Sequence, residues 1–241
     1  MRHLKNVIPI GWDGSLVSVR KIREENGSGQ HIYYFRSPKN NRLFIFCGVI
    51  PFVQAVLLEG TPDIASYTAL SVSNPRDSAA EKPHELSCLV ATRRNGQKIV
   101  YEPRHVGNGP VAPRSQSDAD LVSRWRDRGW FDKDTAIQVV TDRDLRKRFV
   151  QLDNWLMLCA AMNRVANRPL VLEQNSIQLL LEQESSCTVD AILNQAGMDA
   201  ACMFAALAHG LASDTLACDT AQRQLVRNSV VTRGGKRDGQ E

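Results

Sequence analysis

Apolar residues along this chain follow a two-residue period in some stretches and a helical period in others. Strands are predicted for three short apolar runs: 42–47, 64–72 and 136–142. After Pro51, which suits the first turn of a helix, apolar side chains follow helical spacing as far as Glu59-Gly60. A loop rich in Gly, Pro and Ser at 105–118 leads into a predicted amphipathic helix at 118–131.

Residues 84–104 predict two more strands, joined by Asn95-Gly96. This dipeptide suits a two-residue type I′ turn, because both residues tolerate positive φ, and such a turn sets Arg94 opposite Gln97. One face of the hairpin then holds alternate side chains: Ser87, Leu89, Ala91, Arg93, Lys98, Val100, Glu102 and Arg104. The order strand, helix, strand, hairpin, helix, strand predicts an α/β fold with a mixed sheet.

The second half of the chain has a helical pattern. Residues 143–169 predict a helical segment that is charged at first and apolar later. Beyond Pro169, three short helices and a terminal ribbon are predicted: 176–184, 188–197, 199–213 and 215–233. Thr188 is a suitable N-cap and Gly197 a suitable end for the middle helix. This order is typical of a winged-helix-like domain.

Length and charge place only broad bounds on function. The chain has 241 residues, of which 43% are hydrophobic, so it can bury the core of one large or two small domains. Its net charge of +4 permits nucleic-acid binding without requiring it. Four parts are predicted: a basic arm at 1–30, a mixed-sheet core at 31–168, the helical domain at 169–233 and a polar tail at 234–241. The arm is either a nucleic-acid contact or a poorly ordered terminus.

The six cysteines are scattered singly and form no CxxC pair. No apolar signal segment precedes them, and no apolar run approaches the ~20 residues of a membrane span. We therefore predict reduced thiols, a cytoplasmic location and no membrane partner. His84, Glu85 and Cys88 do not suggest zinc, because strand alternation separates His84 from Glu85 and no second ligand pair has suitable spacing.

Several stretches together resemble the TnsA endonuclease family, whose members are subunits of heteromeric bacterial transposases. The matching stretches are FRSPKNNRLFIFCGVIPFVQAVLLEGTPDIASYTA, LSCLVATRRNGQKIVYEP, AIQVVTDRDLRKRF and the C-terminal helices up to VVTR. The resemblance implies a restriction-endonuclease-like core at 31–168, followed by an α-helical winged-helix-like domain at 169–233. It also implies three kinds of partner: DNA, a transposase subunit and an ATP-dependent regulator subunit.

The family's nuclease centre uses a glutamate near the start of the first helix, an aspartate on one hairpin strand and a Q/E-x-K on the other. Such carboxylates bind Mg²⁺, which activates water and stabilises the leaving oxygen, while the lysine orients the nucleophile or screens the developing charge. The resemblance places these positions here at Pro51, Ser87, Val100 and Glu102. None keeps its residue type, and proline, serine and valine would not hold a hard dication as a catalytic centre. We therefore expect a pseudonuclease that needs no metal or other cofactor.

Two alternatives remain open. In the first, Glu85, Lys98 and Glu102 form a rearranged site on the hairpin, and the protein is an active Mg²⁺-dependent endonuclease. In the second, the protein is a DNA-binding regulator outside transposition, which predicts specific, salt-sensitive binding without a transposase partner.

Basic residues gather in two places that the expected core directs toward DNA. Nucleic-acid contact is predicted for Arg93, Arg94 and Lys98 at the hairpin tip, and for Arg143, Arg146, Lys147 and Arg148 after the strand at 136–142. In the expected fold the two clusters converge on phosphates, although charge runs of this kind also occur on ordinary solvated surfaces. The helix at 199–213 offers mainly alanines and one histidine, which favours packing against protein over reading bases. The sequence thus predicts a TnsA-like subunit of a DNA transposition complex, without nuclease activity, that binds DNA ends or partner subunits.

Overall fold

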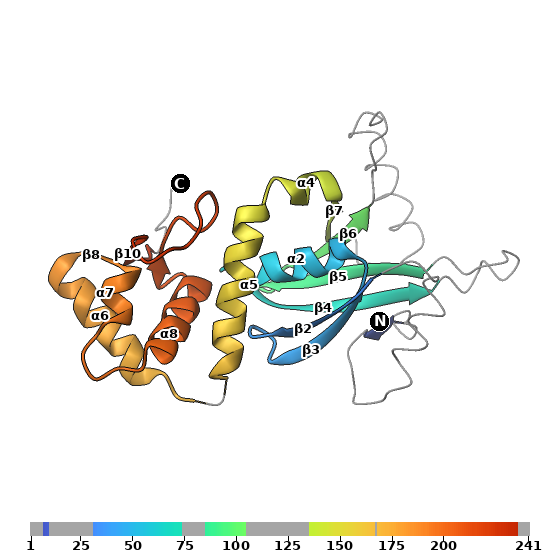
Figure 1. The fold of residues 1–241 in the computed structure, drawn as a ribbon. Coiled ribbons are helices and arrows are strands. Elements are labelled where there is room, and N and C mark those ends of the chain that lie inside the picture. Colours follow the sequence, from blue (N-terminus) through green and yellow to red (C-terminus); the bar gives the residue numbers. More distant parts are fainter. Residues whose placement is uncertain (1–6, 10–30, 74–84, 105–134, 167, 236–241) are drawn as a thin grey trace, which may run out of the picture. The chain divides into compact units, whose positions relative to one another are not determined.

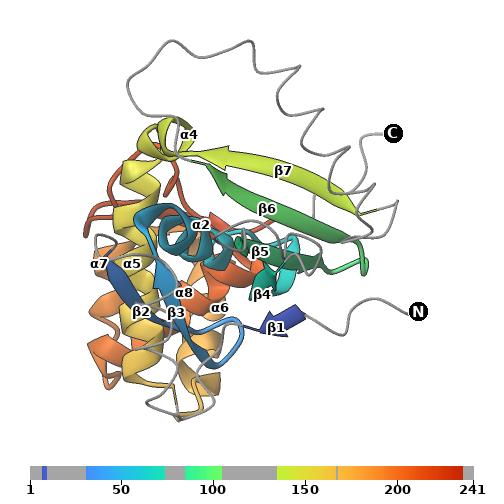
Figure 2. The ribbon, with the colours of Figure 1, turned by 90° about the vertical axis from the view of Figure 1, so that its right-hand side faces the viewer.

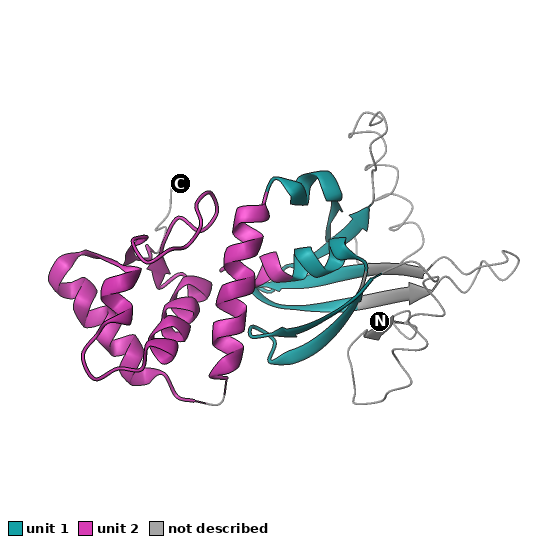
Figure 3. Cartoon of the chain, viewed as in Figure 1, with its two compact units in different colours: residues 1–55, 63–147 teal, residues 56–62, 148–241 magenta. Residues whose placement is uncertain are grey.

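The computed structural model describes residues 7–9, 31–73, 85–104, 135–166 and 168–235. The chain divides into two compact units (Figure 3). Unit 1 contains residues 1–55 and 63–147, and unit 2 contains residues 56–62 and 148–241. The predicted loop and helix within 105–131, most of the basic arm and most of the polar tail lie outside the described residues.

A five-stranded sheet forms the centre of unit 1, in the order β1-β4-β5-β6-β7 (Figures 1 and 2). Its strands are β1 (Val7–Pro9), β4 (Ile64–Ser73), β5 (Glu85–Arg93), β6 (Lys98–Arg104) and β7 (Ala136–Thr141). Neighbouring strands are antiparallel except β6 and β7, which are parallel. The predicted α/β fold with a mixed sheet is therefore confirmed.

A two-stranded hairpin and a helix complete the apolar packing of unit 1. They are β2 (Ile32–Ser37), β3 (Arg42–Cys47) and the first part of α2 (Val49–Glu59), which belongs to unit 2 from Val56 onward. The Tyr33 ring stacks on Phe52 of α2 with centroids 4.6 Å apart, and Phe44 stacks on Tyr67 of β4 at 5.4 Å. Pro51 falls in the first turn of α2, where backbone N–H groups have no partner within a helix.

The turn of the β5–β6 hairpin differs from the prediction. The Arg93 N–H donates to the Gln97 carbonyl at 2.8 Å and the Gly96 N–H to the Arg93 carbonyl at 2.9 Å, which defines a three-residue loop over 94–96. Gly96 has φ of 85°, whereas Asn95 does not adopt positive φ and instead accepts a hydrogen bond from the Gln97 N–H. A three-residue loop with glycine in this position is the other common way to close a hairpin. The predicted type I′ turn is therefore wrong, and the register is shifted by one residue.

A short helix, α4 (Asp142–Arg146), follows β7 in unit 1. Thr141 is its N-cap, and the Thr141 and Asp144 side chains each accept a hydrogen bond from the other residue's backbone N–H. This reciprocal capping explains why a helix begins directly where the strand ends.

Unit 2 contains four helices and a small sheet among its described residues. They are α5 (Phe149–Arg164), α6 (Val171–Glu184), α7 (Val189–Leu193), α8 (Ala200–Ser213), β8 (Ser186–Thr188), β9 (Leu216–Ala217) and β10 (Val230–Arg233). The sheet is antiparallel in the order β8-β10-β9. Thr188 caps α7 as predicted, because its hydroxyl accepts the Ala191 N–H at 3.1 Å, but α7 ends at Leu193, before Gly197.

Helix α8 is the core of unit 2 and packs against α5, α6, α7 and β9. Its alanines and glycine allow these close approaches, and Met203 and Leu207 have no exposed surface. Because α5 packs on α8, the division between the units falls at Lys147/Arg148, whereas the sequence predicted it near residue 168.

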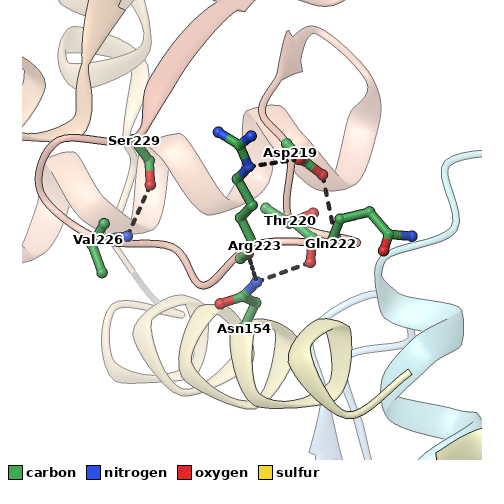
Figure 4. A network of polar contacts seen from close by, with 7 residues as sticks. All are labelled: Asn154, Asp219, Thr220, Gln222, Arg223, Val226 and Ser229. Carbon is green, nitrogen blue, oxygen red and sulfur yellow. Dashed lines mark hydrogen bonds and ion pairs between the residues drawn. The ribbon is translucent and has the colours of Figure 1, made fainter. Parts of the chain in front are cut away.

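A long segment between β9 and β10 is tied to α5 by one amide side chain (Figure 4). Asn154 is 2% exposed, and its amide nitrogen donates to the carbonyls of Thr220 at 2.9 Å and Arg223 at 2.8 Å. Its oxygen accepts the Leu225 N–H at 2.8 Å. Three backbone groups in a segment without regular structure are thereby satisfied by a single buried residue.

Candidate nucleic-acid interface

The register of β5 and β6 decides which side chains share the hairpin face where the nuclease centre was expected. Val90 lies opposite Val100, and Leu89 lies opposite Tyr101. Continuing by one residue sets Cys88 opposite Glu102. The face that carries Val100 and Glu102 therefore also carries Cys88 and Val90, and not the predicted Leu89 and Ala91, because a one-residue shift moves every side chain of a strand to the other face.

This face is closed to solvent at its centre. Val100 is 0% exposed, Cys88 2% and Glu102 7%. Pro51 lies in α2 and contributes no ligand atom from its side chain. Ser87 pairs with Ser71 in the backbone register of β4 and β5, and its side chain lies outside the described part of the structure.

The rearranged site is described only in part. Glu85 pairs with Ser73 in the backbone register, and its side chain lies outside the described part of the structure. Lys98 is exposed and stands four residues from Glu102, about 13 Å along the strand. Among the residues that the structure describes, no group of three or more His, Cys, Asp or Glu side chains is placed to hold a metal ion.

Glu102 instead interacts electrostatically with two neighbouring side chains, those of Arg104 and Cys88. An oxygen of its carboxylate lies 3.7 Å from an Arg104 guanidinium nitrogen. Burial, and secondarily the negative charge of Glu102, raise the pKa of the Cys88 thiol to about 12. Cys88 is therefore a neutral core side chain and not a nucleophile.

The raised pKa of Cys88 predicts a loss of stability in alkali. The folded-state pKa of about 12 exceeds the ordinary value of 9.0, so the unfolded chain releases the thiol proton first as pH rises. We expect the wild type to lose more free energy of unfolding than Cys88→Ala does between about pH 8 and about pH 11. Urea denaturation of both proteins at several pH values measures this difference, and parallel pH profiles would contradict it.

The two predicted basic clusters lie at opposite ends of β6. Lys98 begins the strand next to the hairpin tip, whereas Arg104, at its other end, pairs with Thr141, directly before α4. A seven-residue strand separates such positions by about 20 Å. The expected convergence of the clusters is therefore wrong, because β7 runs parallel to β6 and carries α4 away from the hairpin tip.

The hairpin tip has a different basic neighbour, the turn between β2 and β3. The Lys39 ammonium group donates to the Ile64 carbonyl at 2.8 Å, and Asn40 accepts the Tyr67 N–H at 3.0 Å. From the other side, the Arg94 N–H donates to the Asp63 carbonyl at 2.9 Å. The start of β4 thus joins both turns. We call the six cations of these turns the two-turn surface: Arg36, Lys39, Arg42, Arg93, Arg94 and Lys98.

The sequence analysis missed half of this surface. Arg36, Lys39 and Arg42 flank a turn more than fifty residues before the hairpin tip, and nothing local in the sequence links the two turns. The available signal was Pro38-Lys39-Asn40-Asn41, a typical turn composition between two apolar strands.

The α4 cluster has a more balanced charge. Arg143, Arg146 and Lys147 are exposed, but Arg146 lies 3.6 Å from the Asp142 carboxylate and Asp144 occupies the same short helix. Arg148 belongs to unit 2, where its guanidinium donates to the Gln151 side chain at 2.9 Å.

Helix α8 does not present a base-reading face. Eight of its residues are buried, and burial lowers the pKa of His209, which is therefore neutral near pH 7. A recognition helix must expose polar side chains to a groove. The helix at 199–213 thus packs within unit 2, as its alanines favour, and its docking to a partner protein stays a prediction.

Comparison of the chain with protein-family models and with curated proteins finds no match. None of the helices in the described ranges is both long and apolar enough to cross a membrane.

Proposed function

We propose that this protein is a non-cleaving, TnsA-like subunit of a DNA transposition complex, which holds DNA ends and binds partner subunits. The supporting observation is the buried, apolar centre of a sheet whose strand order suits a nuclease. The antiparallel strands β4, β5 and β6, with β7 parallel to β6, follow α2 in the order expected for a restriction-endonuclease-like core. Val100, fully buried, stands where that resemblance places an acidic or amide side chain.

Unit 2 supports the partner-binding part of the proposal. Its elements run α6, β8, α7, α8, β9, β10, with β10 between β8 and β9, as in a winged-helix domain. Since the enclosed α8 offers no base-reading face, we assign DNA contact to unit 1, and to unit 2 the docking of a transposase or an ATP-dependent regulator subunit that the resemblance implies.

The decisive experiment is cleavage of supercoiled plasmid by the purified protein with Mg²⁺ or Mn²⁺. We expect no nicking above the level of a Glu102→Ala control, together with a gel shift of duplex DNA at low salt. Metal-dependent nicking that Glu102→Ala abolishes would overturn the proposal in favour of an active endonuclease. Failure to associate with a DDE-type transposase encoded beside it, tested by co-purification, would argue against the transposition role.

A further inference from the structure

We propose that the two-turn surface binds the phosphate backbone of double-stranded DNA, and that the α4 cluster does not. This inference deepens the proposed function, on which it rests for the choice of DNA, by assigning the contact to one end of the sheet. Half of the surface, Arg36, Lys39 and Arg42, lies outside the basic residues that the sequence singled out.

Charge separates the two candidate surfaces. The described segments 36–42, 63–66 and 92–98 contain six cations and one carboxylate, that of Asp63. In contrast, residues 142–147 carry three cations and two carboxylates. Phosphate binding depends on the cations that displace counterions from the duplex, so the more strongly positive surface is favoured.

Contacts within unit 1 order the cations before any ligand binds. The Arg36 guanidinium donates to the Asn41 side chain at 3.0 Å, and the Arg42 guanidinium lies 5.7 Å from the centre of the Phe44 ring. Arg93 contacts the Asp63 carboxylate at 3.1 Å and the Gln97 side chain at 3.2 Å. Held in this way, these long side chains lose less conformational entropy on binding.

The exposed residues of the surface suit a phosphate backbone. Arg36, Arg94 and Lys98 are exposed, as are the neutral side chains of Asn41, Asn95 and Gln97. Cations and amides of this kind supply most contacts to phosphate oxygens. Since neighbouring strands lie about 5 Å apart, the turns at β4, β5 and β6 cover on the order of 10–15 Å, enough for several phosphates.

The aromatic side chains argue for a duplex over a single strand. Proteins that bind single strands stack successive bases on exposed aromatic rings. Here Tyr33 stacks on Phe52 and Phe44 stacks on Tyr67. Among the described residues of unit 1, Tyr34, at 56% exposure, is the one exposed aromatic ring. One ring offers no platform for a run of bases.

The test compares two double variants that remove the same charge from opposite ends of β6. Arg94→Gln/Lys98→Gln alters the two-turn surface, and Arg143→Gln/Lys147→Gln is the matched control at α4. Fluorescence anisotropy with the full chain and a labelled duplex of about 20 base pairs gives the affinity at several salt concentrations. Thermal unfolding of each variant verifies that it is folded.

We expect the Arg94/Lys98 variant to bind at least about tenfold more weakly than wild type, with a salt slope smaller by about 2. The Arg143/Lys147 variant should stay within about twofold of wild type. Equal losses in both variants would overturn the assignment of the surface while leaving DNA binding intact. Tighter binding of a single strand, lost in Tyr34→Ala, would overturn the choice of a duplex. Both outcomes are independent of the plasmid-cleavage result.

Discussion

Replacing Asn154 by alanine should lower the free energy of unfolding by about 3 kcal/mol, because one buried side chain serves three backbone groups. Without it, the carbonyls of Thr220 and Arg223 lose their partner (Figure 4), and so does the N–H of Leu225. The hydrogen bond to Leu225 is buried and those to Thr220 and Arg223 are partly buried; a buried group left without a partner costs about 1–3 kcal/mol, and a small cavity adds to the loss. Urea denaturation followed by circular dichroism measures the effect.

Asp153→Ala provides the matched control, since the neighbouring side chain on α5 is exposed. Its effect should stay within about 0.5 kcal/mol. In Asn154→Ala, the amide of Leu225 should also exchange with solvent much faster, because local opening no longer breaks a hydrogen bond to α5. A fully stable Asn154→Ala protein would mean that the segment between β9 and β10 is held by other contacts.

Gly60→Ala should destabilise the protein by about 2–3 kcal/mol, as expected for overpacking against a rigid neighbour. A Cβ atom at residue 60 would overlap the indole ring of Trp155, which is almost completely buried. Gly60 is thus required for space and not for an unusual backbone angle. Thermal unfolding measures the loss, and Gly235→Ala, where a Cβ meets no atom within 4 Å, should have almost no effect.

A double-mutant cycle identifies the cause of the Gly60 effect. Trp155→Phe alone should be destabilising, because it leaves space in the core of unit 2. In the Gly60→Ala background the smaller ring accommodates the added methyl group, so the combined loss should be clearly less than the sum of the single losses. Additive losses would show that the clash is relieved elsewhere.

Local patterns predicted the secondary structure well, as the strands β3, β4 and β7 and the helices α2 and α8 show. The hairpin register was wrong because Asn-Gly fits both a two-residue loop and the last positions of a three-residue loop. The hydrogen bond from the Gly96 N–H to the Arg93 carbonyl identifies the three-residue loop. With this loop, Cys88 and not Leu89 lies on the same face of the hairpin as Glu102.

Features that depend on contacts between residues far apart in the chain could not be predicted from local sequence patterns. The helical content of α5 was predicted, but its grouping with unit 2 depends on packing against α8, about fifty residues later. Similarly, the two-turn surface exists because Asp63 and Ile64 contact turns on either side. The cations at the hairpin tip could be identified from the sequence, but not the residues with which they share a surface.

The closed hairpin face constrains how a metal centre could be introduced into this fold. The shared face holds positions 88, 90, 100 and 102, so carboxylates would have to be placed there. Cys88 and Val100 have almost no exposed surface, and a carboxylate introduced at either position would lose its water and favour the neutral form, which binds Mg²⁺ poorly. Neighbouring side chains would first have to shrink and admit solvent. A metal centre at this face would therefore need an opened cavity before any acidic substitution, and single acidic substitutions should give folded but inactive proteins or unfolded ones.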